Sequence, residues 1–355
     1  MKHDAPTYHI LGAGVAGLSA AKLLRMRRPE SKITVYEAAA QPGGRCRSYF
    51  DTRLGAVADM ATHVILGANK NALSLLKEPV FSGFPPFYDY ARHKRTAFFP
   101  HHISEAALAL FNQPLRETAP GIVLNTARKL FPFLPCCLKV WYSKNDLSSA
   151  LIAPLSAYPD TLKTGSVLKS FAEADGKITK LFFNKACVEV APEDKIICAL
   201  DAQNYARIFQ GPVFDFNCIV NIIFRTSMAL SFPGRKPFLG IKNALPQWLF
   251  AAPGFLSVTV SDASAAFCND NEAARNVWKQ ICEIRGREAA FMPPYRMIKH
   301  RRATLRHDRK NNSLRPDSPV TRWKNMLLAG DWTMKNYPCS IEAAVLSARR
   351  ATAEI

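Results

Sequence analysis

Residues 8–17 read Tyr-His-Ile-Leu-Gly-Ala-Gly-Val-Ala-Gly and decide the fold of this chain. The apolar start of the stretch predicts a buried strand, and residues 15–27 carry apolar side chains at helical intervals. Between these two elements Gly12, Gly14 and Gly17 follow the spacing G-x-G-x-x-G. A strand, a turn and a helix with this spacing are typical of a dinucleotide-binding site.

Each of the three glycines has its own expected task. Gly12 permits a tight turn, Gly14 lets a pyrophosphate approach the backbone, and Gly17 lets the helix pack closely on the strand. The backbone N–H groups at the start of the helix, around Ala16, would then face the phosphates. Glycine-rich turns also join strands and helices without any ligand, so the motif needs further support.

A second strand supplies part of that support. Ile33-Thr-Val-Tyr-Glu37 is rich in β-branched residues and ends in an acid. Glu37 lies twenty residues beyond Gly17, where a carboxylate would bind ribose hydroxyls, although a solvated strand end would also fit. Strand, helix and strand together predict an α/β, Rossmann-like domain.

The segment Gln41-Pro-Gly-Gly-Arg-Cys-Arg47 adds a feature that a plain NAD-binding fold lacks. It resembles the extended FAD signature of the flavin amine oxidase and phytoene desaturase superfamily, whose FAD-binding domain is of the glutathione-reductase type. In that setting Gly43 and Gly44 would bring the backbone close to the cofactor. Arg45 would offer a planar cation to a phosphate or to the flavin, the alternative being a basic surface turn.

The C-terminal part of the chain fits the same site. Residues 325–331 form an apolar strand that ends in Gly330 and Asp331, and Ser340 is a plausible N-cap for an alanine-rich helix that starts at Ile341. In a flavoprotein the positive end of this helix would stabilise negative charge on the reduced flavin. Asp331 would hold a ribityl or phosphate-side group, or it could simply end the strand.

The middle of the chain predicts a second, inserted domain of α+β type. A hairpin around residues 177–183 and an apolar strand at 194–199 would complete the cofactor sheet, followed by a helix at 201–209. Strands at 218–224 and 257–261 and a helix at 271–284 would belong to the second domain. We therefore expect an FAD-binding domain of residues 1–75, 165–213 and 315–355, and a substrate domain of residues 76–164 and 214–314.

Composition limits the class of protein. The 355 residues are 48% hydrophobic and 21% charged, as in a globular protein. The nine cysteines include no C-x-x-C pair, which argues against disulfides or zinc and favours a reducing, cytoplasmic location; no other metal motif is visible. The first strand begins by Tyr8, which leaves no room for a signal peptide, and no apolar run is long enough to span a bilayer.

The formal net charge of +19 predicts attraction to anionic surfaces. Ten lysines and arginines lie between Arg296 and Lys324. No nucleic-acid-binding motif accompanies them, so nucleic acid is not expected, and anionic lipids on the inner face of the membrane are the better partner for an apolar substrate. A solvated basic face is the plain alternative. Phe131-Pro-Phe-Leu-Pro135 would suit a pocket wall, a membrane-facing surface or an irregular core.

Further segments resemble one family within that superfamily, the squalene-associated FAD-dependent desaturases, also called hydroxysqualene dehydroxylases. They follow the order of that family over roughly residues 8–100 and 165–355. The segments are Asp59-Met-Ala-Thr-His-Val-Ile-Leu-Gly-Ala68, Cys218-Ile-Val-Asn-Ile-Ile-Phe-Arg225, Gln247-Trp-Leu-Phe250, Ser257-Val-Thr-Val-Ser261, Arg301-Arg-Ala-Thr304, Arg315-Pro316, Leu328-Ala-Gly-Asp-Trp-Thr333, Pro338-Cys-Ser-Ile-Glu-Ala-Ala344 and Ser347.

The resemblance implies an FAD enzyme of triterpene synthesis that removes the hydroxyl group of hydroxysqualene and gives squalene. His63, Asp59 and His300 are candidate proton donors. The chain departs from the family in residues 334–339, at Ala343 in place of glycine and at His300 in place of an acid, and its 100–165 region looks shortened. An oxidoreductase for an amine, carotenoid or porphyrinogen, or an inactive flavin-binding protein at a membrane, remains open. The sequence gives no oligomeric state and no electron donor.

Overall fold

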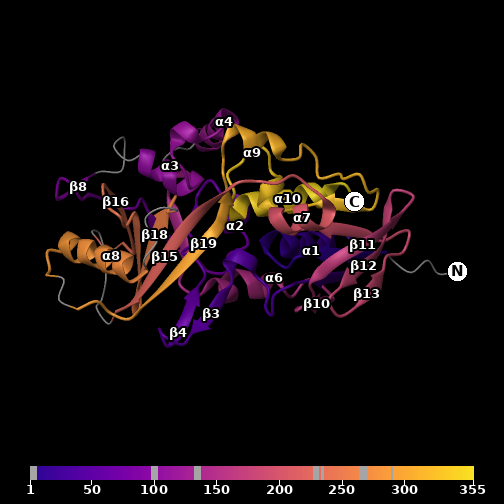
Figure 1. The fold of residues 1–355 in the computed structure, drawn as a ribbon, viewed down its shortest axis with the longest axis horizontal. Coiled ribbons are helices and arrows are strands. Elements are labelled where there is room, and N and C mark those ends of the chain that lie inside the picture. The colour runs from indigo at the N-terminus through magenta and orange to yellow at the C-terminus, as the bar shows by residue number, and fades with distance from the viewer. Residues whose placement is uncertain are drawn as a thin grey trace.

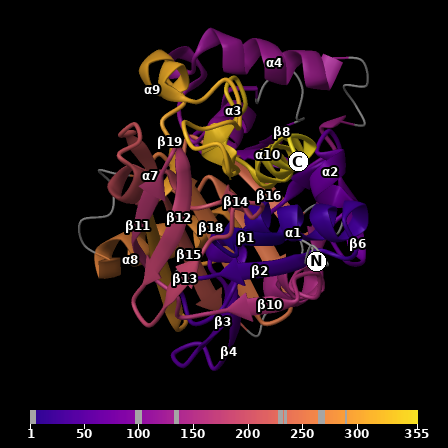
Figure 2. The ribbon, with the colours of Figure 1, turned by 90° about the vertical axis from the view of Figure 1, so that its right-hand side faces the viewer.

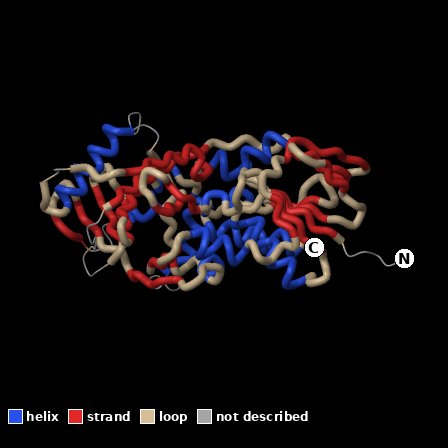
Figure 3. The backbone as a smooth tube through the Cα atoms, turned by 90° about the horizontal axis from the view of Figure 1, so that it is seen from below, coloured by secondary structure: helices blue, strands red, loops and turns tan. Residues whose placement is uncertain are grey.

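The computed structural model describes residues 6–96, 103–131, 137–226, 232, 236–263, 270–288 and 291–355. Its strands gather toward the two ends of an elongated molecule, with helices between them (Figure 3). In Figure 1, α1 (Val15–Arg27) and β10 (Thr161–Lys163) mark the cofactor half, and α8 (Asp270–Ile284) marks the other half. Of the expected Phe131–Pro135 segment, residues 132–135 lie outside the described residues.

A parallel five-stranded sheet forms the centre of the cofactor half. Its first strand and helix form as the sequence predicts, and the strand expected at 194–199 joins as β14. The sheet also takes in β10, although we expected its residues in the substrate domain. The strand order is β10, β2 (Lys32–Tyr36), β1 (Thr7–Leu11), β14 (Lys195–Cys198) and β20 (Met326–Leu328).

Two distant helices cover this sheet. The helix α10 (Ile341–Ala353) packs beside α1 in one hydrophobic core, and Arg27 of α1 donates to the carbonyl of Thr352. A π-helical turn, η4 (Ser148–Ile152), and the short α6 (Ala153–Leu155) add to the same core. Figure 2 shows α1 and α10 on one side of the β1 and β2 region.

The expected hairpin does not complete the parallel sheet. It forms β11 (Leu168–Ala174) and β12 (Lys177–Phe183), which with β13 (Cys187–Glu189) make an antiparallel sheet of their own. This sheet packs on the other face through a second core that includes the helix α7 (Ala202–Phe209). The hairpin was therefore predicted correctly as an element but wrongly as a member of the cofactor sheet.

The other half is built on a seven-stranded mixed sheet. Helix α8 packs on it through Val277, Trp278 and Ile281. The strand order is β19 (Tyr295–Leu305), β15 (Phe216–Arg225), β18 (Phe255–Ser261), β17 (Trp248–Ala252), β16 (Phe238–Lys242), β7 (Phe87–Asp89) and β8 (Lys94–Thr96).

Smaller elements join the two halves. One hairpin is β3 (Ser48–Asp51) with β4 (Ala56–Asp59), and a small sheet holds β5 (Ile65–Leu66), β9 (Val140–Ser143) and β6 (Pro79–Gly83). The short helices are η1 (Gly44–Cys46), α2 (Lys70–Leu73), η2 (Leu115–Glu117) and η6 (Asp331–Thr333). The helices α3 (Ile103–Phe111), α4 (Pro120–Leu130) and α9 (Arg309–Leu314) form the top of the molecule in Figure 1.

Candidate functional site

Two of the three fingerprint glycines, Gly12 and Gly17, are required by the backbone geometry of the folded protein. Gly12 follows β1 with φ +103°, and a Cβ there would lie 2.8 Å from the carbonyl oxygen of Ala199. A Cβ on Gly17 would lie 2.0 Å from the carbonyl oxygen of Gly12. The turn and the close packing of α1 on β1 therefore explain these two positions without any ligand.

Gly14 is different, because nothing in the described chain requires glycine there. Its φ of −76° is open to any residue, and no atom lies within 4 Å of a Cβ built on it. Gly14 is also the N-cap of α1, which has no side-chain cap and no acidic residue in its first turn. The amides around Ala16 thus start a helix whose positive end suits an anion, so the turn fits the pyrophosphate of FAD.

Glu37 lies against the same turn. One of its carboxylate oxygens accepts the amide of Ala13 at 2.8 Å, and the other accepts the amide of Ala39 at 2.8 Å. The expected acid at the end of β2 is therefore beside the glycine turn. Its binding of ribose stays a prediction.

The Gly-Gly-Arg segment packs on the fingerprint. Gly43 and Gly44 have φ of +116° and +56°, which favours glycine at both positions. The amide of Gly43 donates to the carbonyl of Ala13 at 2.8 Å, and a Cβ on Gly44 would lie 3.6 Å from the Cα of Gly14. The space beside Gly14 is thus bordered by a second turn without side chains.

Arg45 links this turn to the C-terminal part of the chain. Its guanidinium donates to the carboxylate of Asp331 and to the carbonyl of Ala303, both at 2.7 Å. Asp331 is buried and raises the pKa of Arg45 above its ordinary value. The adjacent Gly330 donates its amide to the hydroxyl of Ser347 at 2.7 Å. Arg45 and Asp331 therefore bind each other in this structure, and the binding of FAD by either residue stays a prediction.

The start of α10 is capped from within. The Ser340 hydroxyl accepts the amide of Ala343 at 3.2 Å, which confirms the predicted N-cap, and Ile341 is the first helical residue. The buried carboxylate of Glu342 accepts hydrogen bonds from Asn71 at 2.7 Å and from the amide of Ala72 at 2.8 Å. This places an acid in the first turn, where it is stabilised by the helix dipole.

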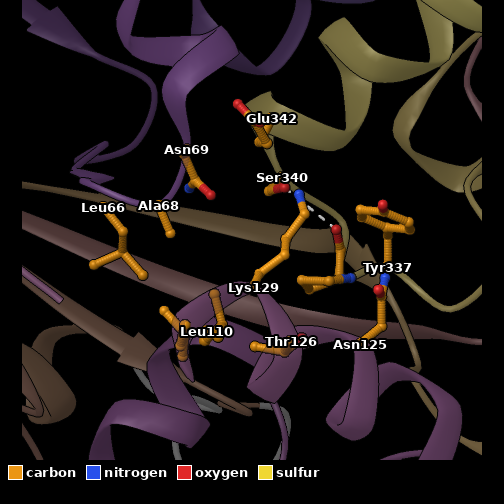
Figure 4. Close-up of a pocket in the computed structure, with 12 residues that line it drawn as sticks. Leu66, Ala68, Asn69, Leu110, Asn125, Thr126, Lys129, Tyr337, Ser340 and Glu342 are labelled. Atoms are coloured by element: carbon orange, nitrogen blue, oxygen red, sulfur yellow. Dashed lines mark hydrogen bonds between the residues drawn. The ribbon is translucent and has the colours of Figure 1, made fainter. Parts of the chain in front are cut away.

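A small cavity of about 30 Å³ opens at this helix start (Figure 4). Lys129 reaches from α4 toward Ser340, and its ammonium lies 4.6 Å from the centre of the Tyr337 ring. The hydroxyl of Thr126 has no hydrogen-bond partner within the described part of the chain. No local sequence pattern points to Thr126 or Lys129, because their position at the cavity depends on how α4 packs.

The three candidate proton donors lie close together, around residues 59–63. The Asp59 carboxylate accepts the Ser48 hydroxyl at 2.6 Å and the amide of Leu147 at 3.0 Å, and burial raises its pKa. The His300 Nε2 atom lies 2.6 Å from the carbonyl of Met60, and burial lowers its pKa. These contacts suit structural roles for Asp59 and a neutral imidazole for His300.

His63 is the candidate best suited to carry a proton. Its Nδ1 atom bonds to the carbonyl of Ala61 at 2.9 Å, and its Nε2 atom lies 3.7 Å from the Sγ atom of Cys46. Burial lowers the pKa of His63, but the negative charge that Cys46 can carry and the Ala61 carbonyl together raise it to about 9. This effect depends on Cys46 being a thiolate, with which a protonated His63 would form an ion pair. The catalytic role of His63 stays a prediction.

A buried network that we did not predict holds the loop before α10. The His307 Nδ1 atom lies 2.7 Å from the carbonyl of Phe111, and its Nε2 atom accepts the amide of Cys339 at 2.9 Å. The buried Arg315 donates to the carbonyl of Met334 at 2.9 Å. A lone histidine gives no sequence signal for such a position, whereas the Arg315-Pro316 pair belongs to the family resemblance.

The fold and the site together define a flavin-dependent oxidoreductase with FAD as its cofactor. The family described as flavin-containing amine oxidoreductases matches residues 161–355, and an NAD(P)-binding Rossmann-like domain matches residues 10–79. The chain belongs to this flavin-containing amine oxidoreductase family.

The curated relatives that align with nearly the whole chain have one activity in their names. The hydroxysqualene dehydroxylase of Rhodopseudomonas palustris is 27% identical over 97% of this chain and 97% of its own length. That of Zymomonas mobilis is 28% identical with the same coverage of each chain. The first alignment runs over 412 positions, more than the 355 residues of this chain, so the relative contains residues that this chain lacks.

Solved structures show the same fold. An oxidoreductase from Methanosarcina mazei superposes with a TM-score of 0.73 over 98% of this chain and all of its own, at 12% identity. A putrescine oxidase superposes with a TM-score of 0.67 over 98% of this chain and 99% of its own, at 16% identity. At these identities the likeness concerns the fold alone.

Proposed function

We propose that this protein converts hydroxysqualene to squalene by reductive dehydroxylation. The single observation that carries the proposal is similarity along nearly the whole chain to relatives of that name. The site supports it, because the glycine turn, Arg45 and the start of α10 can hold FAD, and the buried His63 is a residue that can carry a proton. The substrate is an isoprenoid lipid.

The residues of the chain have separate tasks in this reaction. The bound cofactor, once reduced by an external donor, supplies the hydride that replaces the hydroxyl group. His63 holds a proton at Nε2 and gives it to the departing oxygen, which leaves as water while the new C–H bond forms. Leu66 and Leu110 are apolar residues of the small cavity at the start of α10, and they would help to exclude water there. Asp59 and His300 hold the backbone that carries His63.

The decisive experiment is an anaerobic single turnover. The FAD-loaded protein is reduced with dithionite and mixed with hydroxysqualene, and flavin absorbance and extracted squalene are measured. We expect one squalene for each flavin that is reoxidised. A flavin that stays reduced would contradict the proposal, and reduction of the oxidised protein by putrescine would instead favour an amine oxidase.

We also propose that the protein works in the cytoplasm, at the inner face of an anionic membrane. Within the described residues, no helix is both long and apolar enough to cross a bilayer. The net charge of +19 and the apolar substrate support a peripheral contact.

A further inference from the structure

The helix α4 has apolar residues on its exposed face as well as on the face that packs on the protein. Its outward stripe consists of Pro120, Leu124, Ala127, Arg128 and the following Phe131, spaced as one helical face. Leu124 is 52% exposed and Phe131 is 82% exposed. A helix that packs on a protein core usually turns such residues inward.

The inward face of α4 combines the fully buried Ile122, which packs in a small core with Phe111, with several polar residues. Asn125, Thr126 and Lys129 line the cavity that reaches Ser340 (Figure 4). The Asn125 amide donates to the carbonyl of Asn336 at 2.9 Å. The inward face of α4 thus contacts the rest of the protein through Ile122 and polar groups, and the apolar stripe on its outward face stays exposed.

Neighbouring residues extend this outward surface. Asn336 also holds α9 through Asn312, so α4 and α9 lie together at the top of the molecule in Figures 1 and 2. Arg309 and Leu314 of α9 are also exposed. We call the exposed residues Leu124, Arg128, Phe131, Arg309 and Leu314 the α4 surface.

The charge of this surface identifies its partner. No acidic residue occurs in α4, whereas Arg128 lies within the apolar stripe and Arg309 is an exposed residue of the neighbouring α9. Leucine and phenylalanine next to arginine on a helix is the pattern of a segment that lies in the headgroup region of an anionic bilayer. The net charge of +19 adds long-range attraction.

We propose that the α4 surface docks the protein on an anionic phospholipid bilayer. This proposal rests on the proposed function for its purpose, because a bilayer is where an isoprenoid substrate dissolves. The helix would then have one face in the lipid and the other on the cavity at the start of α10.

The test measures binding of the FAD-loaded protein to vesicles of phosphatidylcholine with and without phosphatidylglycerol. The variant Leu124→Ser/Phe131→Ser should bind the anionic vesicles at least about tenfold more weakly than the wild type. Arg128→Gln should weaken only the binding to anionic vesicles, by about fivefold. Flavin absorbance and the thermal midpoint of each variant show that it remains folded.

The control is a second exposed apolar pair on the far side of the molecule. Phe50 and Val57 face each other across the β3–β4 hairpin and are 63% and 52% exposed. Phe50→Ser/Val57→Ser should bind vesicles like the wild type.

Three results would overturn the proposal. The first is that the wild-type protein does not bind anionic vesicles. The second is that only Phe50→Ser/Val57→Ser loses vesicle binding. The third is a dimer in solution that Leu124→Ser/Phe131→Ser alone dissociates. None of these results depends on turnover, so failure of the docking surface is distinguishable from failure of the proposed reaction.

Discussion

Among individual residues, the three fingerprint glycines separate folding from cofactor binding. A Cβ at Gly12 or Gly17 would collide with backbone, whereas one at Gly14 would meet nothing in the described chain. Spacing alone treats the three positions alike. The structure distinguishes them, and the distinction can be measured.

Gly14→Val should fold but fail to bind FAD. Loss of a helix N-cap glycine changes the free energy of unfolding of the cofactor-free protein by about 1 kcal/mol. The new side chain fills the space meant for pyrophosphate, so FAD affinity should fall at least about 100-fold, or about 3 kcal/mol. Absorbance titration measures the affinity, and urea unfolding measures the stability.

The control for that variant is Gly17→Ala. Its Cβ would lie 2.0 Å from the Gly12 carbonyl oxygen, so the folded state itself should lose about 3 kcal/mol. Retained flavin in Gly14→Val would contradict the cofactor assignment.

His307 should make stability depend on pH. Burial, followed by the charge of Arg315, lowers its pKa from 6.5 to about 4 in the folded protein. The unfolded chain therefore binds a proton first, so this stabilisation is complete above pH 6.5 and is lost as the pH falls toward 4. The full effect is about 3 kcal/mol.

The comparison is with His307→Gln, which cannot titrate. His9 and His300 also have lowered pKa values and act in the same direction, so both proteins should lose stability in acid. Urea unfolding between pH 7 and pH 5 should show the smaller loss in the variant. Equal losses would mean that His307 does not resist protonation.

At the scale of elements, α10 is positioned by its own cap. Ser340→Ala removes the acceptor for the Ala343 amide and should lower the free energy of unfolding by about 1 kcal/mol. The matched control is Ser313→Ala, whose hydroxyl bonds to a carbonyl at an exposed site. Urea unfolding of the cofactor-free protein measures both, and an unchanged Ser340→Ala would contradict the cap.

The elements that sequence reasoning placed correctly are those with local signals. Glycine spacing fixes the β1 turn and the start of α1, and Ser340 with its alanine-rich sequel fixes α10. Helix α7 and strand β18 also form where their periodicity indicates. Each of these signals lies within a few residues of the element it describes.

The errors concern partners far apart in the chain. No local sequence pattern shows that the β11–β12 hairpin pairs with β13 and not with the parallel sheet. The strand β10 is too short to show a strand pattern. The buried position of His307 depends on Phe111 and Cys339, which come from separate segments. Such contacts depend on long-range packing, which spacing does not encode.

At the scale of the whole molecule, FAD should raise the free energy of unfolding, because it binds segments that are far apart in the sequence. Residues 12–45 and 330–341 border the same site, so a ligand that binds both stabilises only the folded state. At a free FAD concentration of about 100 times its Kd, the gain is about 2.7 kcal/mol, which should raise the Tm by about 3–4 °C. Calorimetry with and without FAD measures it, and an unchanged Tm would contradict a site shared by both segments.

His307 links α3 to the loop before α10 through its two ring nitrogens. Its Nδ1 atom bonds to the carbonyl of Phe111 at the end of α3, and its Nε2 atom accepts the amide of Cys339, the residue before Ser340. A shift of α3 on lipid binding would therefore move the start of α10, which is part of the proposed FAD site. The flavin absorbance of the FAD-loaded protein should then change when an unreactive lipid analogue binds, before any reaction occurs.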